Sequence, residues 1–141
     1  MVGALKSRTF DENETFALGV KLAEELKPGD IISFTGELGA GKTVLIRGIC
    51  SRLSPAAEVS SPSYTLVNTY PGRGLIVNHV DLYRIEGETE LAGLGLDELF
   101  ESGDITLIEW GEKLEGSIPG NAIKIKIIII DESTREIEIE R

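Results

Sequence analysis

One stretch decides the fold: Gly36-Glu37-Leu38-Gly39-Ala40-Gly41-Lys42-Thr43. It matches the pattern G-x-x-x-x-G-K-[ST], which is typical of loops that hold nucleotide phosphates. The β-rich run at 31–35 predicts a strand before the loop, and apolar residues at helical spacing predict a helix at 43–53 after it. Because strand, loop and helix in this order are the context that confirms the pattern, a glycine-rich turn that matches by chance is the weaker interpretation.

The residue types in this loop suit the binding of a polyphosphate. Glycines let the backbone curl so that its N–H groups point at phosphate oxygens, and the helix that follows presents its positive N-terminal end. Lys42 is expected to reach the β- and γ-phosphates, and Thr43 to offer its hydroxyl to Mg²⁺. We therefore predict a bound Mg-nucleotide that contacts Gly36, Glu37, Leu38, Gly39, Ala40, Gly41, Lys42 and Thr43.

Two carboxylates that end apolar runs are candidates for the metal side of the site. Asp81 follows the run 75–80, and Glu109 follows the run 105–108. Without the loop, each would be interpreted as an ordinary acid paired with a surface Lys or Arg. A phosphate-binding loop, however, needs an acid at the end of a neighbouring strand to orient the metal's water shell, so both are predicted to be catalytic and metal-binding. His79 is expected to be a structural hydrogen-bonding residue.

Composition limits the class of protein. With 141 residues, 41% of them hydrophobic, the chain is expected to form one nucleotide-binding domain over residues 1–141. Its formal charge of −10 disfavours a direct grip on tRNA or DNA, because binding to nucleic acid depends on basic residues. No apolar run has the length of a signal peptide or a membrane span, so we expect a cytoplasmic protein that does not contact a membrane. The single cysteine, Cys50, is expected to be a buried small side chain.

The rest of the chain alternates strand and helix signals. After a short strand at 7–10, Asp11 and Glu14 form a capping-box pattern at the start of a helix whose apolar residues are Phe16, Val20, Ala23 and Leu26. Further runs predict a hairpin at 64–70 and 75–80, short helices within 85–104, a strand at 105–108 and a closing hairpin at 122–130 and 135–139. The predicted fold is α/β: a three-layer P-loop NTPase domain with a mixed central sheet and an antiparallel C-terminal hairpin.

Four blocks of the chain together resemble one family. They are the loop 36–43, the segment Ser61-Pro62-Ser63-Tyr64-Thr65-Leu66-Val67, the run His79-Val80-Asp81-Leu82-Tyr83-Arg84 and the tetrapeptide Ile108-Glu109-Trp110-Gly111. In this order and at these spacings they resemble TsaE (also called YjeE), the P-loop ATPase subunit of bacterial tRNA threonylcarbamoyladenosine (t6A) biosynthesis. The resemblance covers essentially the whole chain.

The resemblance implies ATP as the nucleotide and Mg²⁺ held by Thr43 with Glu109, with Asp81 in an acidic role near the metal or the attacking water. It implies that the segment 61–67 acts as a switch whose hydroxyls, on Ser61, Ser63 and Thr65, sense the γ-phosphate; members of the family usually carry threonine at the position of Ser63. It also implies that the adenine lies between the two chain ends, at Glu12 and Arg135. The implied partners are the TsaD and TsaB subunits, in the modification of tRNA at A37.

Trp110 and the rate of hydrolysis leave alternatives open. Trp110, the only tryptophan, is interpreted either as a core residue or as a contact with a partner. No arginine finger is recognisable, so we expect slow hydrolysis by the isolated chain. A nucleotide-dependent protein-binding module with incidental hydrolysis would share every binding residue. A small-molecule kinase is disfavoured because the stretch 85–104, where a basic lid would be inserted, contains no Lys or Arg, and a GTPase is disfavoured because no Asn-Lys-x-Asp sequence occurs.

Overall fold

A mixed seven-stranded sheet runs through the computed structural model, which describes residues 4–37, 39–62 and 65–141. The strands are β1 (Ala4–Thr9), β2 (Ile31–Gly36), β3 (Val67–Pro71), β4 (Ile76–Asp81), β5 (Ile105–Glu109), β6 (Ile123–Ile129) and β7 (Arg135–Glu140). The helices are α1 (Glu12–Ala23), α2 (Lys42–Leu53), α3 (Glu88–Ala92) and α4 (Leu96–Glu101), and a 3-10 helix, η1, spans Gly111–Ser117. The predicted α/β fold with a mixed sheet is confirmed, whereas η1 was not predicted.

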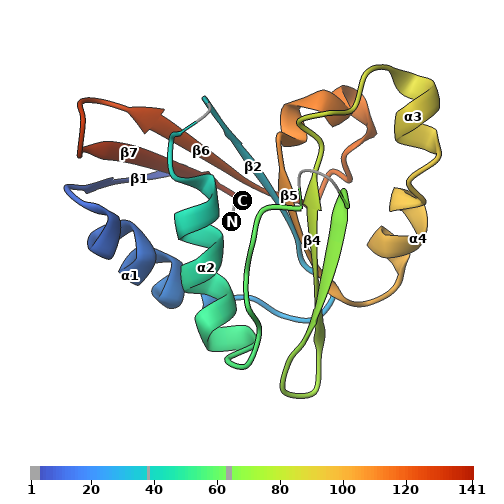
Figure 1. Cartoon of the computed structure of the whole chain (residues 1–141), viewed down its shortest axis with the longest axis horizontal. Coiled ribbons are helices and arrows are strands. Elements are labelled where there is room, and N and C mark those ends of the chain that lie inside the picture. The colour runs from blue at the N-terminus through green and yellow to red at the C-terminus, as the bar shows by residue number, and fades with distance from the viewer. Residues whose placement is uncertain (1–3, 38, 63–64) are drawn as a thin grey trace.

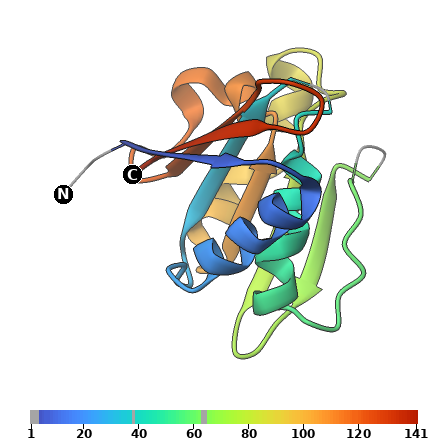
Figure 2. The same cartoon turned by 90° about the vertical axis from the view of Figure 1, so that its left-hand side faces the viewer.

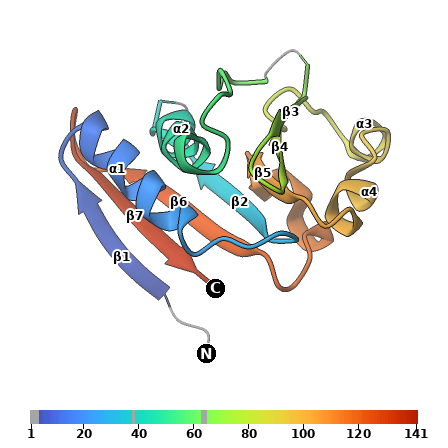
Figure 3. The same cartoon turned by 90° about the horizontal axis from the view of Figure 1, so that it is seen from below.

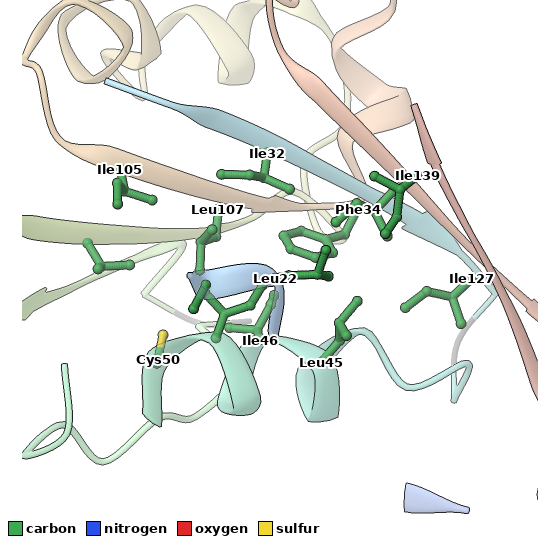
Figure 4. Packing of buried hydrophobic residues seen from close by; sticks show 14 of the residues in the cluster. Leu22, Ile32, Phe34, Leu45, Ile46, Cys50, Ile105, Leu107, Ile127 and Ile139 are labelled. Carbon is green, nitrogen blue, oxygen red and sulfur yellow. The ribbon is translucent and has the colours of Figure 1, made fainter. Parts of the chain in front are cut away.

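Helices cover both faces of the sheet, so the fold has three layers (Figures 1 and 3). Helices α1 and α2 lie on one face, and α3, α4 and η1 lie on the other. The larger core lies under α1 and α2, where Phe34, Leu45 and Leu107 are fully buried (Figure 4). Cys50 is buried in this core as expected, and its burial raises the pKa of the thiol to about 12. None of the helices in the described part of the chain is both long and apolar enough to cross a bilayer.

Three parallel strands bring the candidate site together. The sheet order is β1-β7-β6-β2-β5-β4-β3, and β5 pairs in parallel with β2 on one side and β4 on the other. Their carboxyl ends therefore meet at one edge of the sheet, the upper edge in Figure 1. In the register of the pairing, Asp81 lies beside Glu109, and Glu109 lies beside Phe34, two residues before the glycine-rich loop.

The closing hairpin is confirmed, but it does not form the end of the sheet. Strands β6 and β7 pair antiparallel around a turn in which the Asp131 carboxylate accepts the N–H groups of Ser133 and Thr134 at 3.0 and 2.8 Å. These two hydrogen bonds lower the pKa of Asp131. Strand β1 pairs with the outer side of β7 and begins at Ala4, three residues before the predicted strand (Figure 2). The hairpin of β3 and β4 is also confirmed, although β3 begins only at Val67.

The start of α1 agrees with the prediction, but its buried face agrees only in part, at Ala23 and Leu26. The Asp11 carboxylate accepts the N–H of Glu14 at 2.8 Å, and the Glu14 carboxylate accepts the N–H of Phe10 at 3.0 Å, which caps the helix. Phe16, predicted as a buried apolar position, is 38% exposed. The helix instead buries the largely small residues Thr15, Gly19, Leu22 and Ala23.

The physical reason is a close approach of the two helix backbones at glycines. A Cβ atom on Gly19 would lie 2.3 Å from the carbonyl oxygen of Leu45, and one on Gly48 would lie 2.1 Å from the carbonyl oxygen of Phe16. These distances leave no room for a side chain at either position. A stripe of small residues carries no hydrophobic periodicity, so the spacing of apolar residues wrongly placed Phe16 on the buried face.

Substitution of Gly48 by alanine should therefore destabilise the fold. The added methyl group forces α1 and α2 apart, and overpacking of this kind lowers the free energy of unfolding by about 2 kcal/mol. Urea unfolding followed by circular dichroism measures the loss. Gly93→Ala is the matched control, because the nearest atom to its Cβ lies 3.5 Å away and its φ of −74° suits alanine. Equal stability of the two variants would contradict the close packing of α1 on α2.

Candidate functional site

The glycine-rich loop joins β2 to α2 through backbone conformations that favour glycine. Gly36, Gly39 and Gly41 have φ values of 152°, 82° and 106°. Gly41 is the N-cap of α2, and no side chain caps this helix end. The space over the loop is open, because a Cβ on Gly39 would meet no atom within 4 Å. An open helix N-terminus above a curled backbone suits an anionic ligand.

Lys42 lies in the centre of this loop. Its side chain is almost fully buried and donates to the carbonyl oxygens of Gly36 and Glu37, the latter at 3.3 Å. Its Nζ lies 3.9 Å from the ring centroid of Trp110, close enough for a cation–π contact. Burial lowers the pKa of Lys42, although the nearby carboxylates of Glu112, Glu109 and Asp81 oppose this effect. An anion in the loop would therefore gain a partly desolvated cation as its partner.

The two predicted carboxylates lie directly beside the loop. Glu109, at the end of β5, accepts a hydrogen bond from the Thr43 hydroxyl at 3.2 Å. Asp81, at the end of β4, accepts from the Ser61 hydroxyl at 2.9 Å and from the N–H of Tyr83 at 2.9 Å. Both carboxylates belong to residues that are only 3% exposed. The structure thus places two acids that are distant in the sequence, Asp81 and Glu109, beside the loop that carries Lys42 and Thr43.

These groups line one pocket of about 280 Å³. Within the described residues, no cluster of three or more His, Cys, Asp or Glu side chains would hold a metal ion alone. One hydroxyl and two carboxylates suit Mg²⁺ all the same, because this ion usually completes its octahedral shell with water and phosphate oxygens. The lining residues are Glu12, Gly39, Ala40, Gly41, Lys42, Thr43, Val44, Ser61, Asp81, Tyr83, Glu109 and Trp110.

A second pocket, of about 290 Å³, adjoins the first and shares part of its lining with it. It is bounded by the start of α1, the glycine-rich loop and the β6–β7 turn. Glu12 and Arg135, the two residues expected beside the adenine, both line it. Arg135 donates from Nε to the carbonyl oxygen of Ala40 at 3.0 Å, which fixes the turn against the loop. Glu12 and Arg135 therefore lie next to the glycine-rich loop, and their contact with an adenine stays a prediction.

Not every predicted residue lies at the pocket. Leu38 and Ser63 fall outside the described residues. Thr65 is exposed, and its hydroxyl donates to the Asn68 side chain at 3.0 Å rather than facing the loop. Trp110 is neither a fully buried core residue nor a free surface residue: it is half-buried, with its ring centroid 5.0 Å from that of Tyr83. Its φ of 61° is rare outside glycine and turns the chain sharply after Glu109.

Two functional candidates were not predicted as such. Tyr83 lines the phosphate-side pocket, and His79 donates or accepts at Glu109, with Nε2 2.7 Å from Oε2. His79 is fully buried, so the expectation of a structural hydrogen-bonding residue is confirmed. The unexpected finding is that its hydrogen-bond partner is Glu109. The alternation of β4 was an available signal, because residues 79 and 81 of a strand point to the same face.

A larger pocket, of about 1010 Å³, lies away from the glycine-rich loop, between α3, α4 and η1. Its rim carries the acids Glu88, Asp97 and Glu98 and one base, Lys113. The Lys113 amine already donates to backbone carbonyls of the chain. Among the described residues that line this hollow there is no glycine-rich loop that carries a lysine, and its three acids are exposed, so it does not compete as a phosphate site.

Comparisons with known proteins find one family and several similar proteins. The family model described as threonylcarbamoyl adenosine biosynthesis protein TsaE matches residues 9–137. A tRNA threonylcarbamoyladenosine biosynthesis protein TsaE from Bacillus subtilis (strain 168) is 38% identical over 133 residues, which cover 94% of this chain and 83% of the relative. The one from Haemophilus influenzae is 37% identical over 134 residues, covering 92% and 84%. The crystal structure of Bacillus subtilis YdiB superposes with a TM-score of 0.83 at 33% identity, covering 99% of this chain and 86% of that one.

Proposed function

The chain belongs to the TsaE family of threonylcarbamoyl adenosine biosynthesis proteins, and from this premise we propose that it is the ATP-binding, slowly hydrolysing subunit required for the t6A modification of tRNA at A37. It acts on a complex of the TsaD and TsaB subunits rather than on tRNA directly. The formal charge of −10 supports a protein partner over a nucleic acid.

One observation carries the proposal. The Lys42 amine, the Thr43 hydroxyl and the Glu109 carboxylate lie around a single pocket, with Thr43 and Glu109 already joined by a hydrogen bond of 3.2 Å. A cation for the phosphates and two oxygen ligands for a metal are what a Mg-nucleotide needs. The two carboxylates would repel a bare polyphosphate, which supports a divalent cation as part of the ligand.

Each residue has a role that follows from its position. Lys42 exchanges its contacts with the loop carbonyls for phosphate oxygens. Thr43 and Glu109 hold Mg²⁺, which when bound neutralises charge on the phosphates, and Asp81 orients the water shell or accepts a proton from water. The Ser61 hydroxyl donates to Asp81 at 2.9 Å and so connects the predicted switch segment to this acid. Glu12 and Arg135 lie where the pocket continues, and they are proposed to flank the adenine.

Hydrolysis should be slow in the isolated chain and faster with the partners. Among the described residues that line the phosphate-side pocket, Lys42 is the only cation, so a second positive charge on the transferred phosphate must come from elsewhere. We expect a rise in kcat of at least about tenfold, measured by phosphate release with Mg-ATP, when purified TsaD and TsaB are added together. Fast turnover by the chain alone, or no response to the partners, would contradict this proposal and favour a free-standing ATPase.

A second candidate function is a nucleotide-dependent binding module. It is favoured by the position of Trp110, whose half-buried ring contacts Lys42 and so links the occupancy of the loop to the surface. In this function ATP promotes assembly with the partners, and hydrolysis is incidental. A nonhydrolysable ATP analogue separates the two functions. If the analogue supports both assembly with the partners and a complete cycle of tRNA modification, turnover is not needed and the chain is the binding module.

A further inference from the structure

A chain of buried hydrogen bonds lies behind Glu109. His79 Nε2 lies 2.7 Å from Glu109 Oε2, and His79 Nδ1 lies 3.2 Å from the Tyr70 hydroxyl. The Tyr70 hydroxyl lies 3.5 Å from the Asn68 side-chain amide and 3.3 Å from the carbonyl oxygen of Ser60. His79 is 0% exposed and Tyr70 is 7% exposed, so water does not replace these contacts.

The donor at the Glu109 end of this chain can be assigned. A carboxylate oxygen only accepts, so the proton between His79 and Glu109 resides on Nε2. The Tyr70 oxygen accepts from the amide of Asn68, and its single proton points either to the carbonyl oxygen of Ser60 or to His79 Nδ1. In both arrangements Tyr70 contacts the ring on the side opposite Glu109, and Nε2 presents a donor to Glu109.

The other oxygen of Glu109 faces the loop. Oε1 accepts from the Thr43 hydroxyl, whereas Oε2 accepts from His79. A hydrogen bond to one oxygen fixes the rotation of the carboxylate, and therefore the direction of the other oxygen. We propose that His79 and Tyr70 are positioning residues, which hold Glu109 in the orientation that the metal site requires. Only one part of this assignment rests on the proposed function, namely that Glu109 binds Mg²⁺.

The hydrogen-bond pattern can be tested without any ligand, because His79 is the only histidine of the chain. In protein labelled with ¹⁵N-histidine, two-bond ¹H–¹⁵N spectra show which ring nitrogen carries the proton. The expected result is a proton on Nε2 that exchanges slowly with water, and that exchanges at least about tenfold faster in Glu109→Ala, because this substitution removes the acceptor. A spectrum with Nε2 unprotonated, or with the proton exchanging as in an unfolded chain, overturns the proposal.

A matched pair of variants tests the consequence for the metal. The side-chain amide of His79→Gln reaches the position of Nε2, whereas that of His79→Asn reaches only the position of Nδ1. Both variants lose the ring, so a merely structural role would affect them alike. We expect the Mg²⁺ concentration that supports half-maximal ATP binding to rise about 10- to 100-fold in His79→Asn and to stay near wild type in His79→Gln. Tyr70→Phe should fall between them.

Binding is measured by titration calorimetry on variants whose folding is checked by thermal melting. An equal Mg²⁺ requirement in the Gln and Asn variants refutes the positioning role. If the wild-type chain binds no Mg-ATP, the proposed function fails instead, and the histidine spectrum alone decides whether His79 holds Glu109.

Discussion

Replacing Lys42 with alanine should lower the affinity for ATP by at least about 100-fold, which corresponds to about 2.7 kcal/mol, and should remove measurable turnover. The amine is the only cation among the described residues that line the phosphate-side pocket, and burial has already removed part of its water shell. A phosphate oxygen that meets such a group gains a charge-assisted hydrogen bond at little further cost of desolvation. Titration calorimetry with Mg-ATP measures the loss.

The fold should survive this substitution. A lysine whose pKa is lowered by burial is harder to charge in the folded state than in the unfolded one, so at neutral pH it contributes no stability through its charge. The sign of the pH dependence follows. Between the lowered pKa and the ordinary value of 10.5, the unfolded chain binds more protons at Lys42, so this residue makes wild type more stable as pH rises through that window. Lys42→Ala should lack this gain.

The control is Lys126→Ala, which removes an exposed lysine from the neighbouring strand β6. It should bind ATP like wild type. A similar loss of affinity in both variants would mean that overall charge, and not the contact made by Lys42, determines binding. Retention of ATP affinity by Lys42→Ala would refute the assignment of the loop.

Much of the candidate site could be predicted because its signals are local. The glycine pattern lies in one run of eight residues, and each acid directly follows an apolar run that became a strand. Strand ends also converge by rule in a parallel sheet, so Asp81 and Glu109 could be placed near the loop before the order of the strands was known. The sequence did not predict that β5 lies between β2 and β4 in the sheet.

The unpredicted features depend on pairs of residues that are distant in sequence. The contact between His79 and Glu109 joins positions 30 residues apart and follows only from the parallel register of β4 with β5. The packing of α1 on α2 depends on Gly19 meeting Gly48, and glycine gives no apolar signal. Hydrophobic periodicity finds a face only where large side chains are buried. It therefore assigned Phe16 to the core, whereas the structure leaves this residue 38% exposed.

Glu109→Gln should separate binding from hydrolysis. The substitution keeps the size of the side chain but removes its charge and replaces one oxygen by an NH2 group, which can neither accept a hydrogen bond nor bind a metal. One of the two oxygens that now face Thr43 and His79 is therefore lost as an acceptor. We expect the partner-stimulated kcat to fall at least about 100-fold, as is typical when a group that stabilises the transition state is removed. ATP affinity without Mg²⁺ should stay within about threefold of wild type.

The matched control for this prediction is Glu112→Gln. Glu112 is exposed, and its charge also acts on Lys42, but it does not line the pocket that contains Thr43. If Glu109 acts only by its negative charge near the lysine, both variants should change ATP binding and turnover alike. If Glu109 holds the metal, only Glu109→Gln should lose turnover, and it should also need a higher Mg²⁺ concentration than wild type, because the missing oxygen is a ligand. Unchanged turnover in Glu109→Gln would leave Asp81, the other predicted metal-binding acid of the pocket, as the residue that prepares the metal.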